Sequence, residues 1–342
     1  MIIIDGSAGE GGGQIIRTSL GLALLTGQAV QLINVRAKRS RPGLQRQHVM
    51  AVLAAAEIGQ AKIAGAEVGS QKIFFTPGQV TPGDYAFDIG SAGSTTLVLQ
   101  TVLPALIAGN TGSRLVIEGG THNSLAPTTG FLAQAFAPLL ARFGPQLSVQ
   151  AQPFGFYPAG GGKLTATIEP TAKLQPVDLL KRGAIVRRRA VAYCSHLPAA
   201  IGDRELKSVS ERLGWTSENS EVETIVLTDT RGPGNVLELT IESEHVTEVI
   251  VAFGERGKPA EVVAKEAAAE ADAYLQAEAP VGMHLADQLL IPLALAGSGS
   301  FVTLPLSLHT TTNMRTIERF LPVKFTHRER SPGQWLVEVH PA

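Results

Sequence analysis

A pattern of apolar runs bounded by glycines occurs three times along this chain, and it restricts the fold more than any other feature. Residues 100–109 (Q-T-V-L-P-A-L-I-A-G) and 288–297 (Q-L-L-I-P-L-A-L-A-G) match at Gln, Pro, Ala and Gly without a gap. D-G-S-A-G at residues 5–9 and I-G-S-A-G at residues 89–93 each precede an apolar run, and the first run ends at Gly27. Such repeats in a glycine-rich chain indicate a structural unit that occurs three times.

The spacing of these copies predicts an insertion. Gly27 and Gly109 lie 82 residues apart, whereas Gly109 and Gly297 lie 188 residues apart, an excess of 106. We therefore expect three similar units, with an insertion between the second and the third that starts near Arg182 and finishes near Pro280. An insertion of this length can form a small domain of its own.

Strand and helix signals alternate through the chain. Residues 184–193 and 236–243 of the insertion are typical of strands, and the Ala- and Glu-rich residues 261–275 are typical of a helix. Start signals for a second helix in each unit stand at residues 41–48, 122–130 and 309–313. Strand-like runs at 113–118 and 301–306 lead into the last two. The pattern predicts α/β units with sheets on one side and helices on the other.

The composition favours a folded cytosolic protein. Hydrophobic residues make up 44% of the 342 residues and charged residues 17%, which suits a large core. The net charge of −1 excludes a general basic field, so an anion site must be a local cluster. The one cysteine, Cys194, excludes an internal disulfide and fits a reducing compartment. We expect no signal peptide, because the N-terminus lacks a basic segment followed by an apolar run, and no membrane span, because no apolar run approaches ~18 residues.

The glycine loop at residues 5–14 (D-G-S-A-G-E-G-G-G-Q) lies between a predicted strand and a predicted helix, where phosphate commonly binds. Neither standard template fits. The dinucleotide pattern requires glycine where Gln14 stands, and the P-loop pattern requires Gly-Lys-Ser/Thr where residues 11–13 are glycines. The carboxylate of Glu10 would repel a bare phosphate unless a metal ion stood between them.

Two groups of side chains are candidates for phosphate chemistry. The first is a basic cluster, and arginine binds phosphate bidentately while staying charged, although the alternative is a solvated loop. Its members are Arg17, Arg36, Lys38, Arg39, Arg41 and Arg46. The second is His309, one of eight histidines, which stands between a predicted strand and a helix start. Neutral imidazole attacks phosphorus well once a partner fixes its tautomer, although a structural role remains an alternative.

Other motifs have simpler interpretations. Arg187, Arg188 and Arg189 lie in a strand pattern, where we expect them to protect a sheet edge. His327 and His340 receive no role. The chain lacks a G-x-S-x-G elbow, an H-E-x-x-H motif and a cysteine pair, which disfavours a serine hydrolase or a zinc enzyme.

Taken in order, these segments closely resemble the RNA 3′-terminal phosphate cyclase family. The similar stretches span nearly the whole chain, whereas the insertion resembles the family only in placement, rough length and the R-G-P-G-N segment at residues 231–235. The similar stretches are residues 9–14, 41–48, 90–106, 155–162 (G-F-Y-P-A-G-G-G), 286–297 and 309–313. The resemblance implies a large domain (residues 1–182 and 281–342) of three βαβαββ-like units, related to the C-terminal domain of translation initiation factor three. It also implies an inserted α/β domain (residues 183–280) of thioredoxin-like topology.

The resemblance also implies the residues of a site. His309 matches the histidine that becomes adenylated, and Glu10 matches a residue that contacts a divalent cation (Mg²⁺ or Mn²⁺) bound with ATP. Positions that match ATP-binding residues are Gln100, Leu285, Ala286, Asp287 and Gln288. Positions expected around the RNA phosphates are Arg17, Arg36, Arg39, Gln47 and His48. His284 stands where the family has tyrosine, so a purine-stacking contact there would depend on imidazole.

The activity implied is ATP-dependent conversion of an RNA 3′-terminal phosphate to a 2′,3′-cyclic phosphodiester. It proceeds through histidine–AMP and RNA(3′)pp(5′)A intermediates and releases pyrophosphate and AMP. Two alternatives remain at this point. One is a non-enzymatic RNA-binding relative in ribosome assembly, and the other is an enzyme of another class on similar units, such as an enolpyruvyl transferase. The partners expected are ATP and RNA with a 3′-phosphate, without a membrane.

Overall fold

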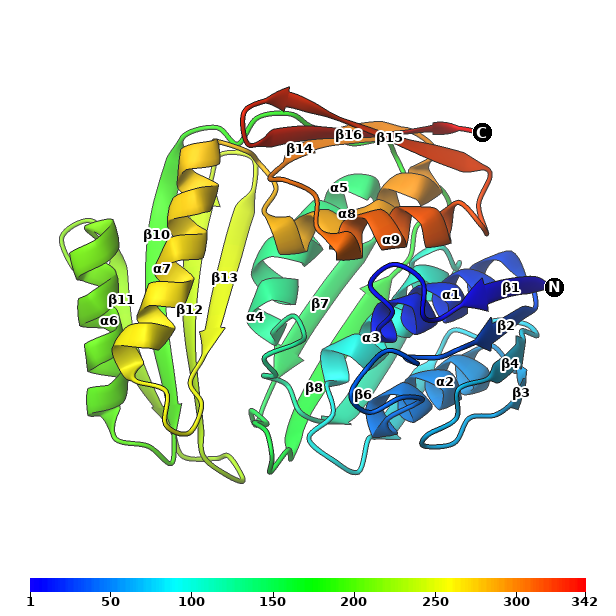
Figure 1. Ribbon diagram of the computed structural model, residues 1–342, viewed down its shortest axis with the longest axis horizontal. Helices are drawn as coiled ribbons and strands as arrows, with labels where there is room; N and C mark the ends of the chain where they lie inside the picture. Colours follow the sequence, from blue (N-terminus) through cyan, green and yellow to red (C-terminus); the bar gives the residue numbers. More distant parts are fainter.

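The computed structural model describes residues 1–342 and is a mixed α/β protein, which confirms the predicted class. Three of its four sheets surround a central group of helices, and the fourth lies to one side (Figure 1). In the first sheet, of order β1-β2-β4-β3, β1 and β2 run parallel, so a crossover helix must join them. Its elements are β1 (Ile2–Asp5), α1 (Gly13–Thr26), β2 (Val30–Ile33), α2 (Arg46–Ile58), β3 (Lys62–Ala64) and β4 (Ile73–Thr76).

The second and third sheets have related pairing. β5 runs parallel to β6 in the order β5-β6-β8-β7, and β9 runs parallel to β14 in the order β9-β14-β16-β15. The second sheet belongs to β5 (Asp84–Asp88), α3 (Thr95–Ile107), β6 (Ser113–Gly119), α4 (Thr129–Phe131), the π-helical η1 (Leu132–Phe136), α5 (Ala137–Phe143), β7 (Gln146–Ala151) and β8 (Gly162–Glu169). The third belongs to β9 (Asp178–Leu179), α8 (Met283–Ala296), β14 (Gly299–Thr303), α9 (Leu308–Ile317), β15 (Val323–Ser331) and β16 (Gln334–Pro341).

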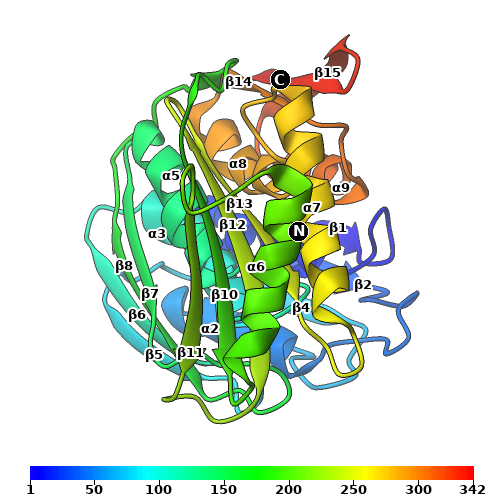
Figure 2. The ribbon, with the colours of Figure 1, turned by 90° about the vertical axis from the view of Figure 1, so that its left-hand side faces the viewer.

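The fourth sheet carries its own small core. Helices α6 and α7 cover one face of the sheet β11-β10-β12-β13 (Figure 2). Strand β13 of this sheet also contacts α4 and η1. A cluster of 15 buried residues, all between positions 190 and 274, fills the space under the two helices. The elements are β10 (Ile185–Ser195), α6 (Ala199–Leu213), β11 (Glu221–Leu227), β12 (Gly234–Ser243), β13 (Thr247–Phe253) and α7 (Ala260–Ala277).

The prediction that the three arginines protect a sheet edge is wrong for Arg189, which pairs with β11 on one side and β12 on the other. Arg187 and Arg188 lie in the part of β10 that extends past β11 and pairs only with β12, so the strand has one edge there. Arg187 makes a bidentate ion pair with Glu221, and Arg189 lies 3.5 Å from Glu223. Arginines of β10 therefore pair with glutamates of the neighbouring strand β11, and such cross-strand ion pairs stabilise a sheet.

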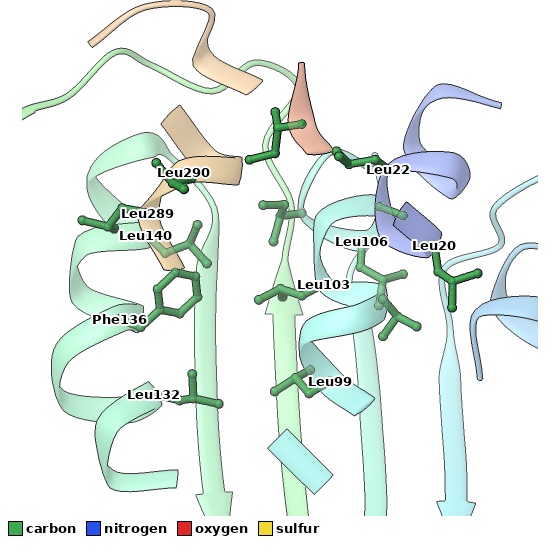
Figure 3. Packing of buried hydrophobic residues seen from close by; sticks show 14 of the residues in the cluster. Leu20, Leu22, Leu99, Leu103, Leu106, Leu132, Phe136, Leu140, Leu289 and Leu290 are labelled. Atoms are coloured by element: carbon green, nitrogen blue, oxygen red, sulfur yellow. The ribbon is translucent and has the colours of Figure 1, made fainter. Parts of the chain in front are cut away.

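A larger core of 60 residues joins the helices of the other three sheets. Leucines of α1, α3 and α8 meet Phe136 of η1 and its neighbours in one apolar layer (Figure 3). Gly21 permits the close approach of α1 to α3, because a Cβ there would lie 2.7 Å from the Thr101 carbonyl oxygen. This packing brings the N-terminal ends of α1, α8 and α9 together. No helix combines the length and apolar composition needed to cross a membrane.

Candidate active site

The glycine loop before α1 turns a carboxylate inward. Gly9 and Gly11 have φ angles of +54° and +63°, a left-handed backbone that favours glycine. The loop doubles back, so that the Glu10 side chain is only 7% exposed and accepts a hydrogen bond of 2.7 Å from the Gly12 N–H. The Glu10 N–H donates to Thr312 Oγ1 at 3.0 Å, which fastens the loop to α9. The positive end of α1 stabilises a negative charge at this place.

A second carboxylate, that of Asp287 on α8, joins the three helices. It accepts hydrogen bonds from Gln14 Nε2 at 2.6 Å and from Asn313 Nδ2 at 2.9 Å. Thr18 Oγ1 in turn donates to Asn313 Oδ1 at 2.8 Å. Burial raises the pKa of Asp287, while the Asn313 hydrogen bond, the charge of His309 and the Gln14 hydrogen bond lower it. The carboxylate is therefore held in place by donors from α1 and α9.

Sequence reasoning assigned no role to Gln14, Thr18 or Asn313. The sequence carries a signal for two of them, because Gln14 ends G-E-G-G-G-Q and Asn313 ends H-T-T-T-N, two of the stretches that resemble the family. Both Gln14 and Asn313 donate to Asp287, which lies 273 residues from Gln14 and 26 residues from Asn313 in the chain. Contacts at such separations cannot be read from the spacing of motifs.

His309 lies in the first turn of α9, which begins after the N-cap Ser307. Its side chain is 55% exposed, and its Nδ1 lies 3.2 Å from Gln14 Oε1. The Gln14 amide donates through Nε2 to Asp287, so Oε1 is the atom that faces the imidazole. A neutral His309 therefore carries its proton on Nδ1, which leaves the lone pair of Nε2 free.

The protonation of His309 also suits a nucleophile. Burial lowers the pKa of the imidazole, Asp287 opposes this effect, and the positive charges of Arg17 and Arg39 lower the pKa further. The neutral form consequently predominates at pH 7. Nε2 lies 3.7 Å from Glu10 Oε1, too far for a hydrogen bond that would occupy its lone pair.

Three of the predicted phosphate-binding residues gather around the same point. Arg39 makes an ion pair with the Glu10 carboxylate and donates to the Glu10 carbonyl at 3.2 Å. Arg17 and His48 both lie against Gly13, where a Cβ would be 2.8 Å from Arg17 Nη1 and 2.5 Å from His48 Nε2. Burial lowers the pKa of Arg17 to about 10, so the guanidinium stays charged at neutral pH.

His48 is held neutral. Burial, with the charges of Arg17 and Arg36, lowers its pKa to about 3. Its Nδ1 accepts a hydrogen bond from the Gln45 N–H at 3.0 Å, and this contact forms part of a capping box at the start of α2. The Nε2–H is therefore a neutral donor directed toward Gly13.

Arg36 and Gln47 make local contacts as well as lying near the site. Arg36 Nη1 donates to the carbonyls of Arg41 and Gly43, both at 2.7 Å, and so shapes the basic loop. Gln47 Oε1 accepts from the Ser94 N–H at 3.0 Å at the start of α3. Arg36 therefore stabilises the basic loop, and Gln47 connects α2 to the start of α3.

The positions predicted to bind ATP divide between a cleft and the core. A cavity of about 70 Å³ lies between α1, α3, η1 and α8, and Gln100, Asp287 and Gln288 line it. Gln100 donates to Gln288 across it. Leu285 and Ala286 are 0% and 1% exposed and pack in the large core.

His284 lies outside this cleft, at the exposed start of α8. Its Nε2 is 3.6 Å from Glu270 Oε1 of α7. An imidazole in this place is accessible to a planar ligand, and it is also close to a carboxylate of the fourth-sheet region.

Glu10 was the predicted metal contact, and it is a lone carboxylate rather than part of a cluster of metal ligands. No group of three or more His, Cys, Asp or Glu side chains is placed to hold a metal. Glu10 offers one carboxylate, already bound to Arg39 and the Gly12 N–H. A single carboxylate suits a Mg²⁺ or Mn²⁺ whose remaining ligands are water and substrate phosphates.

Comparison with known proteins identifies the family of this chain. The family described as "RNA 3'-terminal phosphate cyclase" matches residues 8–327. A protein named RNA 3'-terminal phosphate cyclase from Koribacter versatilis is 51% identical over 325 residues, which cover 95% of this chain and 91% of that protein. Proteins of the same name from Salmonella typhimurium and Pseudomonas fluorescens are 46% and 47% identical, over 99% of this chain and 98% of each relative. The chain therefore belongs to the RNA 3'-terminal phosphate cyclase family.

Proposed function

We propose that this protein uses ATP to convert the 3′-terminal phosphate of RNA into a 2′,3′-cyclic phosphodiester, with His309 as the nucleophile. The observation that carries the proposal is the chain Asp287–Gln14–His309, which fixes the proton on Nδ1 and leaves Nε2 free. The names of the relatives, which cover almost the whole chain, support the reaction class.

In the first step His309 Nε2 attacks the α-phosphorus of ATP. A nitrogen–phosphorus bond forms, the bond from the α-phosphorus to the bridging oxygen breaks, and pyrophosphate leaves. The imidazole gains positive charge, which the Gln14 Oε1 stabilises through the Nδ1–H. Arg17 and Arg39 lie close enough to stabilise phosphate charge, and a divalent ion on Glu10 would neutralise more of it.

In the second step an oxygen of the RNA 3′-phosphate attacks the phosphorus of histidine–AMP, which gives RNA(3′)pp(5′)A and restores His309. In the third, the neighbouring 2′-OH attacks the terminal RNA phosphorus, loses its proton to solvent and expels AMP. Attack within one ribose has an effective concentration of about 10⁵–10⁸ M, so we assign no general base to this step. Arg17, Arg36, Arg39, Gln47 and His48 are the proposed contacts of the RNA end.

We also infer the finer description of the fold. The three sheets in which a parallel strand pair is followed by an antiparallel hairpin are three βαβαββ units, contributed by residues 1–182 and 281–342. Residues 183–280 form an inserted domain of thioredoxin-like topology. Its support is the separate core and the strand order of the fourth sheet.

The experiment is incubation with α-labelled ATP and Mg²⁺ or Mn²⁺, without RNA. We expect label bound to the protein in a form that is labile to acid and stable to alkali, and no label on His309→Ala. Equal labelling of His309→Ala would contradict the role of His309. The absence of label from the unmodified protein would favour a non-catalytic RNA-binding protein.

A further inference from the structure

We propose that the turn at residues 155–162 and Arg231 bind the RNA strand upstream of its 3′-phosphate, with Tyr157 stacking against a base. This inference rests on the proposed function, because it takes the RNA end to lie at His309. It assigns a role to the G-F-Y-P-A-G-G-G stretch and to the fourth-sheet region, neither of which contributes to the nucleotide cleft.

The side chains of Phe154 and Phe156 anchor the turn on the residues beneath it, His122 and Tyr193. Phe154 stacks on the buried His122 with ring centroids 4.1 Å apart and lies 5.5 Å from the ring of Tyr193 on β10. Phe156 is 4% exposed and packs 5.5 Å from His122. The next residue, Tyr157, is 77% exposed. The packed neighbours fix the backbone that carries Tyr157, and its exposed ring is accessible for stacking on a base.

A continuous line of contacts joins this turn to the site. A Cβ on Gly160 would lie 3.0 Å from the Ala92 Cα, so the turn rests against the segment that begins α3. Gln47 binds the Ser94 N–H of the same segment at 3.0 Å. Gln47 is the neighbour of His48, which lies beside Arg17. These contacts place the turn and the phosphate-binding residues around the same end of α3, and the proposed strand runs from the terminal phosphate past this end toward Tyr157.

Two cations lie along this line without a carboxylate partner. Arg46 is exposed and donates only to the Gly90 carbonyl, at 3.0 Å. Arg231 is exposed, lies against Gly161 and makes no ion pair, not even with Asp229 two residues before it. Guanidinium groups without a carboxylate partner, together with an exposed aromatic ring on the same path, match the phosphates and bases of a single strand. Such contacts are independent of base sequence.

The test compares two RNA probes that end in the same 3′-phosphate, a dinucleotide and a 10-mer. Fluorescence anisotropy gives Kd for the unmodified protein, Tyr157→Ala, Tyr157→Phe and Arg231→Gln, and the thermal midpoint of each variant checks folding. We expect Tyr157→Ala to weaken 10-mer binding by at least about fivefold, as loss of one base stack does. The dinucleotide should bind as before, and Tyr157→Phe should keep 10-mer affinity. Arg231→Gln should lower the salt dependence of 10-mer binding by about 0.7 in log–log slope.

The contrary results are distinct. Unchanged 10-mer affinity in Tyr157→Ala, or an equal loss for both probes, would overturn the proposal. If Tyr157→Ala and Arg231→Gln both bind the two probes as the unmodified protein does, this surface would instead be assigned to a protein partner. Self-adenylation of the unmodified protein in the absence of RNA reports separately on the proposed function. Adenylation without any length dependence of binding would refute the strand path alone.

Discussion

Replacement of Gln14 tests the source of His309 reactivity. Gln14→Leu keeps similar side-chain volume but removes both the donor to Asp287 and the acceptor for His309 Nδ1. The imidazole would then be free to carry its proton on Nε2, where no lone pair remains to attack phosphorus. The lost hydrogen bond acts on an imidazole that becomes charged as it reacts, so its contribution is about 1.5–3 kcal/mol. That range corresponds to a decrease of about 10- to 150-fold in the adenylation rate constant.

The assay is single-turnover formation of labelled protein from α-labelled ATP at saturating ATP, which separates the rate constant from nucleotide affinity. Thr18→Val is the matched control, because it removes the Thr18–Asn313 hydrogen bond in the same network but leaves the Gln14–His309 contact. We expect the control to retain adenylation within about threefold, the effect of one neutral hydrogen bond. A Gln14→Leu rate constant no lower than that of Thr18→Val would refute the tautomer argument.

Three further predictions concern other parts of the structure. Glu10→Ala should impair adenylation strongly while binding of 3′-phosphorylated RNA, measured by anisotropy, stays largely intact; comparable loss of both would indicate a structural role for the loop. Burial lowers the pKa of His122 to about 3, so its neutral form stabilises the fold above pH 6.5, and this stabilisation is lost as pH falls from 6.5 toward 3. His122→Phe should therefore show a smaller loss of unfolding free energy over that range in urea titrations, and an unchanged pH slope would contradict the assignment. Gly21→Ala should reduce the free energy of unfolding by about 1–3 kcal/mol, because it overpacks the α1–α3 contact, and an unaltered urea midpoint would show that the helices can move apart.

Much of the helical framework could be predicted from local sequence. Gly27 and Gly297 end α1 and α8 in left-handed conformation, as C-terminal glycines do. The helix predicted at residues 261–275 is observed as Ala260–Ala277, and the strand predicted at 113–118 as Ser113–Gly119. These signals depend on neighbours within a few residues, which the sequence contains directly.

Other features required three-dimensional information. Residues 284–288 were expected to act together, but consecutive residues of a helix point in different directions, so Leu285 and Ala286 face the core while Asp287 and Gln288 face the cleft. The strand pattern of residues 184–193 could not show that β11 pairs with β10 only from Arg189 onward, since interior and edge strands alternate in the same way. The Gln14–Asp287 contact escaped prediction because it arises only when α1 packs beside α8.

The position of AMP on His309 tests the central claim most directly. The protein, labelled with ¹⁵N in its histidines, is incubated with ATP and a divalent ion without RNA, and the adduct is examined by ³¹P and ¹⁵N NMR. We predict phosphorus coupled to Nε2 of His309, with the proton retained on Nδ1. Phosphorus on Nδ1, or on any other residue, would contradict the account.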